Sequence, residues 1–220
     1  EQKAEPLEEA PEAAANKTIR QRFLREAKSV GQLSHPNVVS MYDVGEESGK
    51  MYLVMELVRG INLQHFLQEE WGDLRTRMKL LEQASRGLGE AHRQKIVHRD
   101  VKPANVLLDD NGAYLTDLGL AKIELDSSAS SRDLTVGTPQ YMAPEILRSR
   151  ADHRADVYSL GVVLYECLTN ELPYAGAGGT GLVVREKDEP PSFPSDYPAP
   201  LADLTRDCLR LDPEDRPQTV

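Results

Sequence analysis

The polar octapeptide HRDVKPAN, residues 98–105, stands between two segments of different apolar periodicity. Ahead of it, apolar residues recur at spacings of three and four from Leu74 to Ala91, which predicts a long amphipathic helix. After it, two short apolar runs flank Asp110-Asn111-Gly112, and Asn-Gly between such runs predicts a tight β-hairpin. The loop is therefore expected between two ordered elements, where side chains can be held in fixed positions.

The other periodic segments predict a strand-containing first part and a helical second part. The expected elements are a helix from Thr18 toward His35-Pro36, strands at 38–44 and 51–57 around a turn at 46–50, and helices at 63–67, 157–168 and 201–209. Asn16 or Thr18 can cap the first helix, which should end before Pro36 because the residue before a proline is pushed out of the helical region.

Composition places the chain among folded proteins and disfavours several function classes. Apolar residues make up 40% of the 220 residues, near the usual globular fraction. Lys and Arg total 26 against 36 Asp and Glu, and this net charge of −10 argues against nucleic acid or anionic lipid as the main partner. No run of about 18 apolar residues is found, so no membrane contact is expected from this segment. Cys167 and Cys208 lie in apolar stretches and are interpreted as core thiols in a reducing compartment rather than as a disulfide.

The two ends of the chain suggest a segment of a longer protein. Residues 1–16 hold five Glu and one Lys, so a net −4 of the −10 lies in what is expected to be a solvated linker. The chain begins with Glu1 rather than Met and stops at Val220 in mid-pattern. We therefore expect truncation at both ends.

The octapeptide carries an acid, two cations and an amide, a density that predicts a site. Asp100 can accept a proton from a hydroxyl, and Lys102 can neutralise a transferring phosphoryl group. The amide oxygen of Asn105 can bind a hard cation such as Mg²⁺, and Asp117 adds a carboxylate after the hairpin. Asn105 and Asp117 together predict an oxygen-rich metal site.

Three motifs in a fixed order carry a resemblance to a known family. HRDVKPAN, Asp-Leu-Gly at 117–119 and Ala-Pro-Glu at 143–145 closely resemble the catalytic loop, metal-binding motif and activation-segment end of protein kinases. The chain from Thr18 to Val220 is most similar to the Hanks-type (eukaryotic-like) Ser/Thr kinases of bacteria. This implies an α+β, bilobal protein-kinase-like fold. The implied parts are an acidic linker at 1–17, a partial N-terminal sheet lobe at 18–55, a hinge at 56–60 and a mainly helical C-terminal lobe at 61–220 lacking its last helix.

The resemblance implies ATP and Mg²⁺ as cofactors and assigns their ligands. Asp100 corresponds to the catalytic base toward a substrate hydroxyl. Glu26 corresponds to the glutamate of helix αC. Met55, Glu56 and Val58 correspond to the gatekeeper and hinge, which hold adenine by backbone hydrogen bonds. The remaining implied ligands are Lys102 at the γ-phosphate and Asn105 and Asp117 at Mg²⁺.

Four further residues resemble structural parts of the family. Asp156, in RADVYSLG, resembles the aspartate that anchors the catalytic loop. Arg216, in DPEDRP, resembles the arginine that pairs with the glutamate here at Glu145. His98 is expected to hold the loop rather than to act in the chemistry, because Asp100 already provides the base. His92 and His153 receive no role.

Regulatory and substrate-docking residues are also implied. Arg99 beside Asp100 resembles the arginine that receives a phosphate on the activation loop. The implied acceptors, whose segment can equally be an ordinary soluble loop, are Ser130, Ser131 and Thr135. The presence of Lys102, and of Gly137-Thr138 ahead of Ala-Pro-Glu, is typical of Ser/Thr rather than Tyr kinases. The resemblance also implies that Thr138 lies in the peptide-docking loop.

The nucleotide-clamping motifs of the family are missing from the expected place. Lys3 and Lys17 are the lysines ahead of Glu26, and neither lies in an apolar strand. A G-x-G-x-x-G-x-V match at 176–183 follows the catalytic loop instead of preceding it, so we interpret it as a flexible connection. Either the segment was cut just after the lysine-bearing strand or the protein lacks the clamp. We favour the first, because the catalytic residues of the C-lobe remain.

The sequence thus predicts a signalling Ser/Thr protein kinase that moves the γ-phosphate of ATP to hydroxyls of protein substrates, with the 220-residue chain itself inactive. Its catalytic domain is expected in the cytoplasm, with membrane anchoring of a full-length protein left open, as is a homodimer for trans-autophosphorylation. The alternatives are a non-catalytic, kinase-like (pseudokinase) binding module or scaffold, and an enzyme acting on a small molecule. The second is disfavoured because residues 137–145 resemble a peptide-docking loop.

Overall fold

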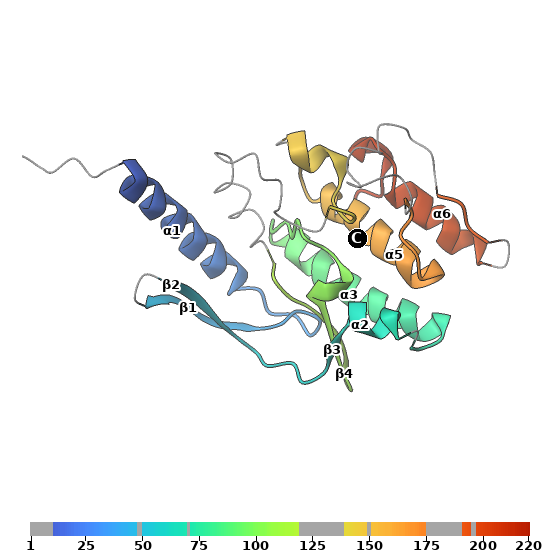
Figure 1. Ribbon diagram of the computed structural model, residues 1–220, viewed down its shortest axis with the longest axis horizontal. Helices are drawn as coiled ribbons and strands as arrows, with labels where there is room; N and C mark the ends of the chain where they lie inside the picture. The colour runs from blue at the N-terminus through green and yellow to red at the C-terminus, as the bar shows by residue number, and fades with distance from the viewer. Residues whose placement is uncertain are drawn as a thin grey trace, which may run out of the picture.

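Short sheets and helices follow one another in the order that the apolar patterns predict, which gives an α+β fold (Figure 1). The computed structural model describes residues 11–47, 50–69, 71–118, 139–148, 151–174, 191–194 and 197–220. The sites expected at Gly119, Ser130, Ser131, Thr135, Thr138 and 176–183 lie outside these ranges. The helices and strands are α1 (Pro11–Val30), β1 (Met41–Glu47), β2 (Lys50–Met55), β3 (Ile61–Asn62), α2 (Leu63–Gln68), α3 (Leu74–Arg93), β4 (Val106–Asp109), β5 (Gly112–Leu115), α5 (Arg154–Thr169) and α6 (Ala199–Cys208).

Helix α1 begins earlier than predicted. Its first residue is Pro11, so the predicted start at Thr18 and the predicted cap at Asn16 or Thr18 are wrong. The physical reason is local: proline is tolerated in a first helical turn, and alanine, abundant at 13–15, has the highest helix propensity. The helix ends at Val30, ahead of Pro36 as expected, and Arg20 pairs with Glu46 of β1.

The predicted hairpin at residues 46–50 is present, but its strands are shifted. Strands β1 and β2 pair antiparallel, with Val44 opposite Leu53. Val38 and Val39, predicted as part of the first strand, instead run beside β5, where the Val39 N–H donates to the Leu115 oxygen at 2.9 Å. The segment before β1 therefore fastens α1 and the hairpin to the second sheet, whose order is β3-β4-β5.

Helix α5 forms the centre of the helical part and lies between α3 and α6 (Figure 1). It is apolar on most sides, and twelve of its sixteen residues are buried, including Tyr158 and Val162. The facing side of α3 contributes Leu81, Leu88 and Ala91. In the part of the chain that the structure describes, no helix has the length and apolar character needed to cross a bilayer.

The close approach of α5 and α6 depends on Gly161. A Cβ atom at this position would lie 2.6 Å from the Cβ of Cys208. We expect Gly161→Ala to lower the free energy of unfolding by about 1–3 kcal/mol, because one helix must move away from the other. Urea denaturation measures this change. The matched control is Gly89→Ala on α3, where the nearest atom would be 3.6 Å away and stability should be unchanged or slightly raised. Equal stability of Gly161→Ala and the parent would contradict the packing.

The two cysteines are free, buried thiols, which confirms the interpretation as core thiols. Burial raises the pKa of both Cys167 and Cys208 to about 12. At pH 8 we expect native thiols to react with iodoacetamide far more slowly than the unfolded chain, whose thiols titrate at about 8.5. Mass spectrometry over time, with and without urea, gives both rates. Rapid labelling of the native chain would show that the thiols are exposed.

Candidate active site

The octapeptide at 98–105 lies in the loop that follows α3, and its last three residues, Pro103–Asn105, form a short 3₁₀ turn that leads into β4. Buried residues fix it at both ends, since His98 is fully buried and Val101 and Pro103 are also covered. The chain can begin the 3₁₀ turn here because Pro103 needs no backbone hydrogen-bond partner at a first helical position. The polar side chains between these fixed points therefore keep defined positions.

The Asp156 side chain holds the loop by binding two of the loop's backbone N–H groups. Its carboxylate is fully buried in α5; Oδ2 accepts from the His98 N–H at 2.8 Å and Oδ1 from the Arg99 N–H at 2.7 Å. Arg99 has a φ of 67°, a left-handed conformation that costs a non-glycine residue about 1–3 kcal/mol. Hydrogen bonds to an ionised acceptor are stronger than neutral ones, so these two stabilise the strained turn that presents Asp100.

His92 contacts the same carboxylate and had no role in the sequence analysis. Its Nε2 lies 2.8 Å from Oδ2 of Asp156, and the side chain is only 9% exposed. A signal was present in the sequence: His92 stands four residues after Leu88 and continues the buried face of α3. A polar residue on an apolar helix face needs a buried partner, and Asp156 is that partner.

Two neighbours in the same loop bind the carboxylate of Asp100. The ammonium of Lys102 lies 2.7 Å from Oδ2 of Asp100, and the Asn105 Nδ2 donates to this oxygen at 2.9 Å. Asn105 also donates to the backbone oxygen of Asp100 at 2.8 Å. Among the described residues, no donor bonds Oδ1. One carboxylate oxygen is thus fixed, and the other can accept a proton from a hydroxyl.

Asp117 is brought next to Asn105 by the end of β5. The Thr116 N–H donates to the Asn105 backbone oxygen at 3.0 Å, and Asp117 follows with a φ of 61°. Asn105 uses its amide nitrogen on Asp100, which leaves its side-chain oxygen for a cation. Asp117 forms no ion pair with any residue that the structure describes. These two oxygen donors fit a hard cation that keeps several waters, which is how proteins commonly bind Mg²⁺.

The expected hinge residues link the two sheets. Met55 ends β2, and the chain continues through Val58 to β3. The Glu56 N–H donates to the Ser40 oxygen at 2.9 Å, while the side chain of Leu57 is 76% exposed. Glu26 lies on α1, the helix that contacts β1. The hinge residues therefore lead into β3, which pairs with β4, the strand that follows the loop carrying Asp100.

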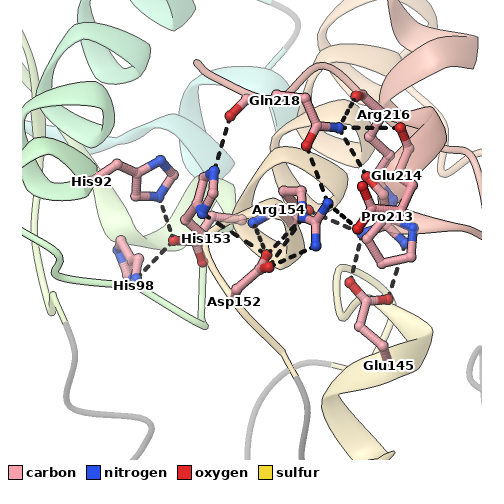
Figure 2. Close-up of polar contacts among 11 residues, drawn as sticks. His92, His98, Glu145, Asp152, His153, Arg154, Pro213, Glu214, Arg216 and Gln218 are labelled. Carbon is pink, nitrogen blue, oxygen red and sulfur yellow. Dashed lines mark hydrogen bonds and ion pairs between the residues drawn. The ribbon is translucent and has the colours of Figure 1, made fainter.

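A buried ion pair lies near the end of the chain, as Figure 2 shows. Arg216 donates to both carboxylate oxygens of Glu145 at 2.6 and 3.0 Å, and its guanidinium lies 4.9 Å from the Tyr158 ring centre. The remaining donors of this fully buried side chain bond the backbone oxygens of Arg154, Arg210 and Leu211. The motif at 143–145 is thereby fixed to the helical part.

Tyr141 and Glu166 form a second buried contact that the sequence analysis did not single out. The Tyr141 hydroxyl donates to Oε2 of Glu166 at 2.7 Å. Burial raises the pKa of both groups. The segment ahead of the Ala-Pro-Glu motif is therefore fastened to α5, the helix that also carries Asp156.

Comparison with known proteins gives one consistent result. The family described as protein kinase domain matches residues 8–220. Similar curated proteins are the serine/threonine-protein kinases PknA of Mycobacterium tuberculosis, 39% identical over 202 residues (88% of this chain, 47% of that protein), PkaA of Streptomyces coelicolor, 37% over 212 residues (94% and 39%), and PrkC of Bacillus subtilis, 37% over 174 residues (77% and 26%). The chain thus spans between 26% and 47% of the length of these relatives.

Proposed function

The chain belongs to the protein kinase domain family, and on this basis we propose that it carries the catalytic loop of a Ser/Thr protein kinase that transfers the γ-phosphate of ATP to protein hydroxyls. The observation that carries the proposal is the geometry of Asp100. One of its carboxylate oxygens is fixed by Lys102 and Asn105, and the loop that presents it is anchored on Asp156. A base held in this way is suited to orient a substrate hydroxyl.

The side chains of the loop divide the work of phosphoryl transfer. Asp100 positions the acceptor hydroxyl and takes its proton. The Lys102 ammonium faces the same point and neutralises charge on the transferring group, whose transition state spreads charge over its oxygens. Asn105 and Asp117 would hold Mg²⁺, which supplies charge neutralisation at the phosphates. Catalysis here rests on positioning and electrostatics more than on covalent chemistry.

The nucleotide is proposed to bind between residues 18–55 and 61–220, against the hinge at 56–60. Met55, Glu56 and Val58 would offer backbone groups to adenine, and Glu26 would face the phosphate side. Because no lysine in an apolar strand precedes Glu26, we propose that the 220 residues alone transfer negligible phosphate and need a Gly-rich loop and a lysine from outside the chain.

Protein substrates, rather than small molecules, are supported by the segment at 139–145, which Tyr141 and Glu166 hold against α5. Thr138 would contact the acceptor peptide. Arg99 would receive a phosphate carried by Ser130, Ser131 or Thr135, transferred there from ATP by a second copy of the complete kinase. The free thiols support a reducing compartment such as the cytoplasm.

The test is phosphate transfer from labelled ATP to a peptide array and, in parallel, to a panel of small hydroxylated metabolites. It compares the 220-residue chain with the product of the complete reading frame that contains it. We expect labelling of Ser or Thr peptides by the complete product and little by the chain. Absence of transfer by the complete product would favour a pseudokinase, and labelling of the metabolites alone would refute protein substrates.

A further inference from the structure

We propose that residues 213–220, here called the C-terminal strap, control through His153 how often the catalytic loop opens. The point of control is the loop anchor, defined as the Asp156 carboxylate with its three donors: the N–H groups of His98 and Arg99 and the Nε2 of His92. His153 contacts the strap on one side and His92 on the other. It reaches the loop only through other groups, so it is a positioning residue.

Gln218 ties the strap to α5. Its Nε2 bonds the backbone oxygens of Pro213, Glu214 and Arg216, at 3.2, 3.3 and 2.6 Å. Its side-chain oxygen accepts from Nη1 of Arg154 at 3.1 Å, and its backbone oxygen accepts from Nε2 of His153 at 2.9 Å (Figure 2). Gln218 therefore both closes the strap on itself and docks it on the first residues of the helix.

His153 extends this contact to the loop anchor. It precedes the first residue of α5, and Asp156 follows three residues later, so both side chains lie on one face of the first turn. His92 of α3 lies against this face. Its ring meets the His153 ring edge to face, with centroids 5.3 Å apart and planes at 70°, while its Nε2 bonds Asp156. Figure 2 shows the His92 and His153 rings next to each other, with a dashed line from the His153 ring to Gln218.

Two contacts determine the orientation of His92. Its other ring nitrogen, Nδ1, is buried and has no hydrogen-bond partner among the described residues. The ring is therefore held by the bond to Asp156 and by packing against His153. Loss of the His153 ring would let His92 turn and weaken one of the three bonds that orient the carboxylate. The other two hold the amides of His98 and Arg99, so the loop would open more often.

The coupling works in both directions, as linkage requires. A partner that displaces the strap would loosen the loop, and a loosened loop would release the strap. An effect on phosphate transfer rests on the proposed function, whereas the exchange of backbone amides does not. Amide exchange therefore tests this inference even if the chain proves to have no kinase activity.

The experiment is NMR-detected hydrogen exchange of the His98 and Arg99 amides in the 220-residue chain. We expect His153→Ala to speed their exchange about two- to fivefold, the lower part of the range for a lost aromatic contact. His153→Phe restores a ring that can pack on His92 but lacks the nitrogen that bonds the Gln218 oxygen, so it should recover only part of the protection lost in His153→Ala. His65→Ala is the matched control, because the exposed His65 ring also packs edge to face, but on Trp71. It should leave both amides unchanged.

A double-variant cycle tests the link to the strap. Gln218→Ala should also speed exchange of the two amides about two- to fivefold in the parent chain. In the His153→Ala background, Gln218→Ala should cause no further increase in exchange, because the contacts of His153 with Gln218 and His92 are already lost. The proposal is overturned if His153→Ala leaves the amides unchanged, if His153→Phe behaves like His153→Ala, or if Gln218→Ala acts equally in both backgrounds.

Discussion

Replacing Asp100 by Asn is expected to lower the rate of phosphate transfer by about 10²–10⁴, the usual contribution of a positioned general base. The amide keeps the shape of the carboxylate and can still accept from Asn105, but it cannot take a proton from the substrate. It also removes the charge that faces the ammonium of Lys102. We therefore expect a loss in kcat with little change in the KM for ATP. Steady-state transfer from labelled ATP by the complete reading-frame product measures both constants.

The control for this variant is Asp110→Asn, which makes the same chemical change at an exposed turn between β4 and β5. It should keep the parent rate. Thermal unfolding of both variants should stay near that of the parent, which separates lost chemistry from lost structure. A variant Asp100→Asn as active as the parent would remove Asp100 from the role of base.

Replacing Arg216 by Ala is expected to lower the free energy of unfolding by about 3–5 kcal/mol, the usual effect of breaking a buried ion pair. The fully buried guanidinium donates to both oxygens of Glu145, whose side chain is only 13% exposed. Its removal leaves that carboxylate without its partner and three backbone oxygens without their donor. It also removes a cation from the face of Tyr158. Denaturant unfolding followed by circular dichroism gives the change.

The matched control is Arg206→Ala. Arg206 likewise pairs with a carboxylate, Asp203 at 2.8 Å, and lies 5.1 Å from the centre of an aromatic ring, Phe193. Because its side chain is 34% exposed, water screens the pair, and we expect a loss of about 1 kcal/mol or less. If both replacements cost the same, burial does not control the strength of these contacts and our account of Arg216 fails.

Local patterns predicted the element types well and their boundaries less well. The Asn-Gly turn at 111–112 and the spacing of α3 each specify one structure within a few residues, so both were predictable. The start of α1 differs from the prediction because the helix propensity of the alanines at 13–15 outweighs the acidic composition of this segment. The pairing of Val38 and Val39 with β5 was unpredictable in principle, since both sheets offer a strand edge and only the packed fold decides between them.

The candidate site likewise combines features that are local in the sequence with contacts that depend on helix packing. The identities and order of Asp100, Lys102 and Asn105 are local, so the sequence alone determined that a carboxylate, an ammonium and an amide share one loop and that this loop resembles the catalytic loop of protein kinases. The hydrogen bond between His92 and Asp156, 64 residues apart, depends on how α3 meets α5. No spacing rule encodes a contact between helices, because it forms only when their apolar faces are buried together. The tertiary structure alone therefore decided that His92 joins Asp156 in holding the loop and that His153 packs beside His92.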